Sequence, residues 1–143
     1  MGISTSNATN YSPTLSLNHN WFNAACLQRM YESLCREHEL SMHAIRDLRH
    51  DMDGREFEML VQGLLKANYG MDWEHWWELV EWNYRNRGDE NRMDQAEERE
   101  IVLRILREWL GREEVSFLPE IRTCVLAFHD YLSREGLTDT MSV

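Results

Sequence analysis

The sequence predicts an all-α protein, a compact bundle of five to six antiparallel helices preceded by a disordered N-terminal tail. From residue 20 onward, apolar residues recur at three- and four-residue steps, which is the spacing of one helix face. No stretch of the sequence alternates polar and apolar residues long enough to indicate a strand. The chain has only two prolines and seven glycines, and most of the glycines fall where the expected helices end.

The length and composition of the chain are those of one globular domain. It has 143 residues, of which 43% are hydrophobic, enough to build a core. Residues 1–18 are poor in apolar groups and rich in Ser, Thr and Asn, so we expect a flexible tail there. We expect residues 19–136 to form a single helical domain and residues 137–143 to fray.

The first helical stretch lies between residues 20 and 50. Its apolar stripe consists of Leu27, Met30, Tyr31, Leu34, Met42, Ile45 and Leu48. A polar run interrupts this stripe, so we expect a break or bend near residues 38–41, with Ser41 capping a second helix. One long helix over the whole stretch is the alternative that the sequence leaves open.

The next two helices have clear boundaries in the sequence. Asp53 and Glu56 have the spacing of a capping box, and Gly70 marks the end of the helix that follows. The apolar stripe between them consists of Phe57, Leu60, Val61, Leu64 and Leu65. Asp72 then caps a helix that we expect to run to about Asn86.

Two further helices complete the domain. We expect one to open at Asp89 or Asp94 and to end at Gly111. Its apolar positions cover about half of its circumference, which predicts contact with more than one neighbour. The last helix is predicted to begin near Pro119, which is tolerated in a first turn, and to end at Gly136.

Most of the tryptophans gather on the helix that follows Asp72. Four of the six lie within ten residues: Trp73, Trp76, Trp77 and Trp82. At 100° per residue, we expect one face to be core, made of Trp73, Trp76, Trp77, Val80 and Tyr84. His75, Leu79 and Trp82 lie on roughly the opposite side. Three glutamates form an acidic flank between the two faces.

We interpret the face with His75, Leu79 and Trp82 as a candidate surface for binding a partner, because tryptophan is enriched in protein–protein interfaces. A ring framed by carboxylates suits an arginine, lysine or methyl-lysine through a cation–π contact, and a basic amphipathic helix also fits. The predicted partner-binding residues are Trp82, Leu79, His75, Glu74, Glu78 and Glu81. The alternative is that this face packs on another helix.

The charge balance narrows the class of partner. The net charge is −10, with 25 acidic against 15 basic residues, which disfavours binding to nucleic acid or anionic lipid. No apolar run has the length of a membrane span. Gly2 fits a short myristoylation pattern, but no polybasic stretch supplies a second anchor. Three cysteines, an odd number, predict a reducing compartment, and therefore an intracellular protein, cytoplasmic or nuclear.

No catalytic or metal-binding motif is evident in the sequence. His38, His43 and His50 are metal-compatible residues, but the spacings of zinc and di-iron motifs are absent. We expect these histidines on a solvated, charge-paired face. There is no glycine-rich loop that would cradle a phosphate. The sequence therefore predicts no catalytic residue, no metal and no cofactor.

From these observations the chain is interpreted as a non-enzymatic interaction module: an adaptor, regulatory subunit or inhibitor that binds a basic or amphipathic segment of another protein. A homodimer that buries the face with His75, Leu79 and Trp82 is left open. Two alternative interpretations assign the chain to other functional classes. One is a small helical enzyme, or a binder of an apolar ligand, with a tryptophan-lined pocket. The other is an acidic inhibitor that mimics nucleic acid.

Overall fold

The computed structural model describes residues 24–86 and 92–140, and it confirms the all-α class. The described residues contain no strand. The α-helices are α1 (Ala24–Ala44), α2 (Gly54–Tyr69), α3 (Trp73–Arg85), α4 (Arg92–Leu110) and α5 (Pro119–Thr140). Two short 3-10 helices are η2 (Arg46–His50) and η3 (Glu113–Phe117). The predicted tail, residues 1–18, lies outside the described residues. None of the described helices has the length and apolar character needed to cross a membrane.

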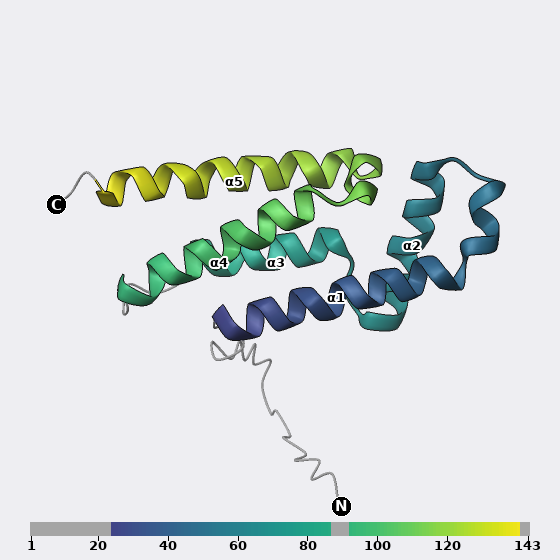
Figure 1. Ribbon diagram of the computed structural model, residues 1–143, viewed down its shortest axis with the longest axis horizontal. Coiled ribbons are helices and arrows are strands. Elements are labelled where there is room, and N and C mark those ends of the chain that lie inside the picture. Colours follow the sequence, from purple (N-terminus) through teal and green to yellow (C-terminus); the bar gives the residue numbers. More distant parts are fainter. Residues whose placement is uncertain (1–23, 87–91, 141–143) are drawn as a thin grey trace, which may run out of the picture.

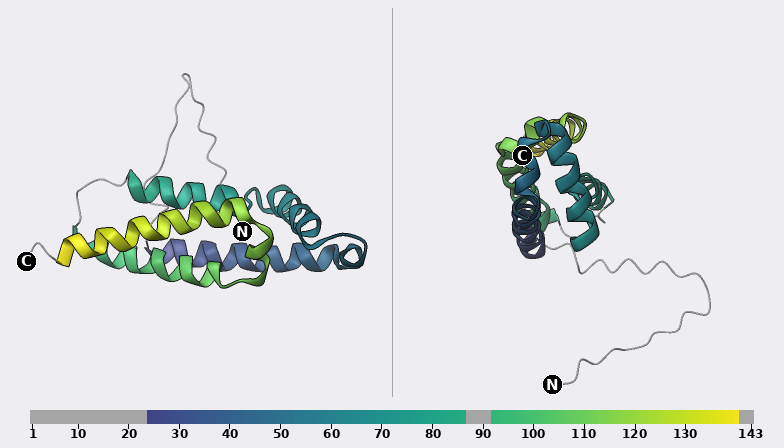
Figure 2. Two further views of the ribbon diagram at one scale, coloured as in Figure 1. Left: turned by 90° about the horizontal axis from the view of Figure 1, so that it is seen from above. Right: turned by 90° about the vertical axis from the view of Figure 1, so that its right-hand side faces the viewer.

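Helices α1, α3, α4 and α5 lie side by side, and α2 crosses one end of the bundle (Figures 1 and 2). Helices α1 and α4 run in one direction, and α3 and α5 run in the other (Figure 1). These four helices therefore alternate in direction along the chain, whereas the contacting pairs α1 with α4 and α3 with α5 run parallel. The parallel pairing of α3 with α5 matters most here, because it lays two sequence segments alongside each other over the length of α3.

The core is built around aromatic rings, as the sequence predicts. The expected core face of α3 is buried in full, comprising Trp73, Trp76, Trp77, Val80 and Tyr84. Trp109 of α4 lies against this face, with its ring centroid 5.9 Å from that of Trp73 and 5.5 Å from that of Trp77. Edge-on and tilted contacts of this kind add to the stabilisation that burial gives. The tryptophans thus join α3 to α4 at the centre of the bundle.

Capping residues fix both ends of α2 and the start of α3. The Asp53 carboxylate accepts a hydrogen bond from the Glu56 amide at 2.9 Å, and the Glu56 carboxylate accepts one from the Asp53 amide at 3.3 Å. Gly70 ends α2 with φ of 83°, a left-handed conformation that favours glycine. Asp72 caps α3 by accepting from the His75 amide at 2.9 Å. All three predicted boundaries are confirmed.

The predicted break near residues 38–41 is wrong. Helix α1 runs without interruption to Ala44 and stops there, so the alternative of one helix to residue 50 is not found either. His38 is fully buried and Ser41 is 5% exposed, so Ser41 lies inside α1 and is not a cap. His38 and Ser41, two polar residues of this run, face the protein interior, and polarity alone therefore did not mark a break in the helix.

Two other boundaries differ from the sequence-based expectation. Helix α4 begins at Arg92, not at Asp94, and Asp89 lies outside the described residues. Helix α5 continues through Gly136 to Thr140. A Cβ built at Gly136 would lie 3.5 Å from the Arg99 guanidinium, so this glycine lies where α4 and α5 approach closely. The predicted end of α4 at Gly111 and start of α5 at Pro119 are confirmed.

Candidate functional site

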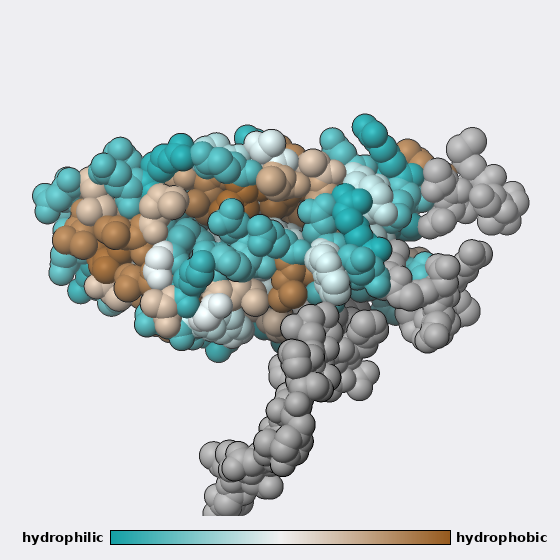
Figure 3. Space-filling model, turned by 180° about the vertical axis from the view of Figure 1, so that it is seen from behind, coloured by the Kyte–Doolittle hydropathy of each residue, from teal (hydrophilic) through white to brown (hydrophobic). Residues whose placement is uncertain are grey.

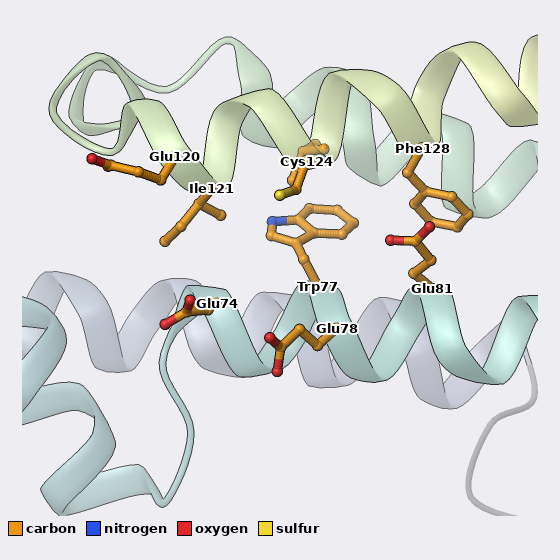
Figure 4. A pocket seen from close by; sticks show the side chains of 9 residues that line it. Glu74, Trp77, Glu78, Glu81, Glu120, Ile121, Cys124 and Phe128 are labelled. Atoms are coloured by element: carbon orange, nitrogen blue, oxygen red, sulfur yellow. The ribbon is translucent and has the colours of Figure 1, made fainter.

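A pocket of about 160 Å³ lies between α3 and α5 (Figure 4). Helix α3 contributes Glu74, Trp77, Glu78 and Glu81. Helix α5 contributes Glu120, Ile121, Cys124, Val125 and Phe128. Seen from behind in Figure 3, a strip of apolar surface lies beneath the uppermost helix, α5, and hydrophilic residues border it. The pocket therefore combines an apolar floor with an acidic rim.

The register of α3 places the carboxylates together. Glu74, Glu78 and Glu81 follow one another at steps of four and three residues, so they form a row on one side of the helix. Trp77 extends from the same side toward α5 (Figure 4). Its ring is 4% exposed and rests edge-on against Trp109 in the core. The floor of the pocket is thus part of the core and is held rigidly by it.

Two of the four rim glutamates are already paired with arginines of the chain. Glu81 lies 2.7 Å from Arg85, and Glu120 lies 2.6 Å from Arg55. Glu120 also accepts a hydrogen bond from its own backbone amide; this bond and the one from Arg55 lower the pKa of its carboxyl. For Glu74 and Glu78, no salt bridge occurs within residues 24–86 and 92–140. The rim is therefore negatively charged at its centre.

Arg85 shows how the chain itself holds a guanidinium beside this pocket. Its Nε donates to Glu81 at 2.8 Å. The guanidinium carbon lies 4.0 Å from the centroid of the Tyr131 ring and 6.0 Å from that of Phe128. Carboxylate pairing and stacking on an aromatic face are the two interactions that arginine makes best. At the end of the pocket nearest Phe128, the chain thus binds one of its own arginines, Arg85, through a carboxylate and aromatic rings.

The predicted partner-binding residues fall into two groups in the structure. Glu74, Glu78 and Glu81 line the α3/α5 pocket, whereas Trp82 is 48% exposed and is not among the pocket residues. Leu79 is half-buried. His75 is exposed, and its Nδ1 lies 2.6 Å from the Asp72 carboxylate. The three glutamates therefore line the same pocket as Trp77, and Trp82 lies outside that pocket, because α5 covers the side of α3 that carries Trp77.

Substitution of Trp82 tests this division of α3 into two sides. We expect Trp82→Ala to lower the free energy of unfolding by less than about 1.5 kcal/mol, because half of the ring already contacts water. The matched control is Trp76→Ala, which removes a ring that is 1% exposed and should cost about 3–5 kcal/mol. Urea unfolding followed by circular dichroism measures both. Equal losses would place Trp82 in the core.

A second cluster of polar side chains is buried between α1, α2 and η3. His38 Nε2 lies 2.7 Å from Glu58 Oε1, and Gln62 donates to the same oxygen at 2.8 Å. Gln62 in turn accepts from the Trp73 amide at 3.0 Å. Glu114 lies 3.5 Å from His38 Nδ1. The expectation that His38 is solvated is therefore wrong, because its polar neighbours come from helices distant in the sequence.

The three histidines singled out in the sequence, His38, His43 and His50, do not gather into a metal centre. His43 is exposed and bonded to Arg46, whereas His38 is buried against Glu58. In the part of the chain that the structure describes, no group of three or more His, Cys, Asp or Glu residues is placed to hold a metal ion.

The fold and the pocket define an acidic helical domain with a tryptophan-floored pocket. Comparison with known proteins finds no matching family model and no significantly similar solved structure. The chain is 35% identical over 80 residues to JmjC domain-containing protein 1 of Schizosaccharomyces pombe, which covers 54% of this chain and 17% of that protein. It is 36% identical over 63 residues to arginine-specific demethylase JMJ20 of Arabidopsis thaliana, covering 44% of this chain and 13% of that protein.

These similarities correct the functional interpretation of the sequence. Both relatives are named as JmjC-type proteins or demethylases, and the second name is that of an enzyme. The interpretation as a non-enzymatic adaptor, regulatory subunit or inhibitor is therefore wrong, and so is the expectation that the protein is not an enzyme. The chain spans less than a fifth of the length of either relative that it matches.

Proposed function

We propose that this chain is a helical domain of a JmjC-type protein demethylase and that it holds a basic segment of the substrate protein. The α3/α5 pocket carries the proposal, because four glutamates there surround an apolar floor. Carboxylates and aromatic rings are groups for binding a cation, and one of the similar proteins is named as arginine-specific. The domain's share of the reaction is thus to bind and orient the substrate.

The overall charge of the chain supports a basic partner. At −10, it attracts positively charged protein segments over distances of about 10 Å and repels nucleic acid. The acidic rim then selects the side chain that enters the pocket. We place this domain inside the cell, in a reducing setting, because Cys35 and Cys124 are free thiols.

A chimeric enzyme tests this function. The 63 residues of JMJ20 that match this chain are replaced by the corresponding residues of the chain, and demethylation of a methylarginine peptide is followed by mass spectrometry. We expect the chimera to retain activity within about tenfold of the parent, because a shared domain should keep the substrate oriented. The control carries an unrelated helical segment of equal length and should lose activity. A folded, monodisperse chimera as inactive as this control would contradict the proposal.

A further inference from the structure

We infer that the α3/α5 pocket binds the side chain of an unmethylated arginine within a peptide segment, with its guanidinium between Glu74 and Glu78. The inference rests on the proposed function and names the ligand of the same site. The bound arginine is then an anchor on the substrate protein, distinct from the methylated residue on which a demethylase acts. Four observations on the pocket support it.

The first observation is the pair of carboxylates at the centre of the rim. Glu74 and Glu78 are four residues apart on α3 and therefore neighbours on its surface. Both are exposed and without a salt bridge among the described residues, and two like charges at this spacing repel each other. A guanidinium carries five N–H donors in a planar fork and can bond both carboxylates at once. An ammonium group is a point charge and matches this pair less well.

The second observation is the apolar floor. Trp77, Val125 and Phe128 are buried, and Ile121 is partly buried beside them. An arginine buries its methylene stem along apolar surface while its charged head stays at a polar rim. Figure 4 shows the rings of Trp77 and Phe128 projecting into the space between the helices, with glutamates on either side. The pocket therefore offers a surface for the stem and partners for the head.

The third observation is an unsatisfied donor. The indole Nε1–H of Trp77 is buried and has no hydrogen-bond partner among the described residues, and Figure 4 shows this nitrogen on the side of the ring toward Ile121 and Cys124. The indoles of Trp73, Trp76 and Trp109 are also unpartnered there, but they do not line this pocket. An indole can only donate, and a guanidinium cannot accept. A carbonyl oxygen of a bound peptide segment would reach this buried donor once the Cys124 side chain, which lies beside it in Figure 4, turns aside; this favours a peptide over free arginine.

The fourth observation is the pair of internal arginines that flank the pocket. Arg85 holds Glu81 near Phe128, and Arg55 holds Glu120 at the start of α5. The two central glutamates are thus the rim carboxylates left for a ligand. A bound arginine would repeat the chemistry that Arg85 already shows beside the pocket, a guanidinium on a carboxylate and an aromatic ring.

Methylation of the ligand should weaken this interaction. Each methyl group replaces an N–H donor and leaves the positive charge in place. Because the rim offers carboxylates, methylation removes charge-assisted hydrogen bonds, which stabilise the complex more than the added methyl groups can by packing on the floor. The pocket therefore distinguishes arginine from dimethylarginine in favour of the unmodified residue.

Binding is tested with short, otherwise neutral peptides that carry one central arginine, lysine, symmetric dimethylarginine or citrulline. Titration calorimetry measures affinity, and alkylation of Cys124, which is exposed and lines the pocket, reports occupancy at this site. Burial raises the pKa of the Cys35 thiol, so Cys35 reacts more slowly at neutral pH, and peptide mapping separates the cysteines. We expect the arginine peptide to protect Cys124 and the other three to bind about tenfold more weakly or worse.

Substitutions in the rim provide the matched comparison. The pair Glu74→Gln and Glu78→Gln should weaken arginine binding by about tenfold or more. The pair Glu97→Gln and Glu100→Gln makes the same change of net charge on the exposed side of α4 and should leave binding and Cys124 protection unchanged. Equal losses in both pairs, or equal affinity for dimethylarginine or lysine peptides, would overturn the inference.

This test is separable from that of the proposed function. An active chimera together with a chain that fails to bind the arginine peptide overturns the arginine pocket alone. An inactive chimera together with specific, rim-dependent binding of arginine overturns the demethylase proposal alone.

Discussion

Replacing Trp73 with alanine is expected to lower the free energy of unfolding by about 3–5 kcal/mol, a large part of the stability of a domain of this size. Trp73 is fully buried, and its ring contacts residues from several helices. Its ring centroid lies 5.8 Å from that of Tyr31 on α1 and 5.9 Å from that of Trp109 on α4. The Arg112 guanidinium lies 5.9 Å from the same ring. Alanine would leave a cavity that no single neighbour can fill.

The measurement is urea unfolding followed by far-ultraviolet circular dichroism. Trp73→Phe serves as a graded control, because it keeps an aromatic ring and most of the packing against α1 and α4 and should cost clearly less. If Trp73→Ala lowers the free energy of unfolding by less than about 1 kcal/mol, the Trp73 ring does not hold α1, α3 and α4 together as the ring-centroid distances indicate.

The sequence predicts those elements whose signals are local. Capping by Asp53 and Asp72, and the left-handed stop at Gly70, depend on residues within one helical turn, and all three are found. The buried face of α3 follows from helical periodicity, and each of its five predicted residues is buried. Where a structural feature is determined by residues close together in the sequence, elementary stereochemistry was sufficient to predict it.

The sequence-based prediction failed where polar residues have partners far along the chain. His38 and Ser41 indicate a break or bend when the sequence of α1 is considered alone. In the structure they face the interior, and His38 meets Glu58 of α2, twenty residues away. The same limit applies to the pocket. The acidic row of α3 is visible in the sequence, but nothing local shows that α5 covers the side with Trp77 and leaves Trp82 half exposed.

The position of Trp77 changes the interpretation of the tryptophan cluster. Its ring belongs to the core stripe and, at the same time, forms the floor of the pocket. A binding surface that is continuous with the core is held in place by the packing of that core, so little ordering is required when a ligand arrives. The sequence presents core and binding surface as alternatives for these tryptophans, whereas in the structure Trp77 belongs to the core and also lines the pocket to which we assign the binding of the substrate segment.

The second large effect is expected at the buried cluster around His38. Glu58 is 2% exposed and contacts both His38 and Gln62 through the same carboxylate oxygen. Glu58→Ala leaves two buried polar side chains without that partner, and loss of one member of a buried polar pair costs about 3–5 kcal/mol. Because the cluster joins α1 to α2, we expect α2 to lose its position across the end of the bundle first.

A double-mutant cycle separates this interaction from the loss of packing. The variants are His38→Ala, Glu58→Ala and the combination of the two, with stability measured by urea unfolding and local opening of α2 by amide hydrogen exchange. The double variant should be more stable than the sum of the single losses predicts, by about 1 kcal/mol or more, because removal of both partners leaves neither of them buried and unpaired. Strict additivity would show that His38 and Glu58 stabilise the fold independently, and that packing alone holds α2 against α1.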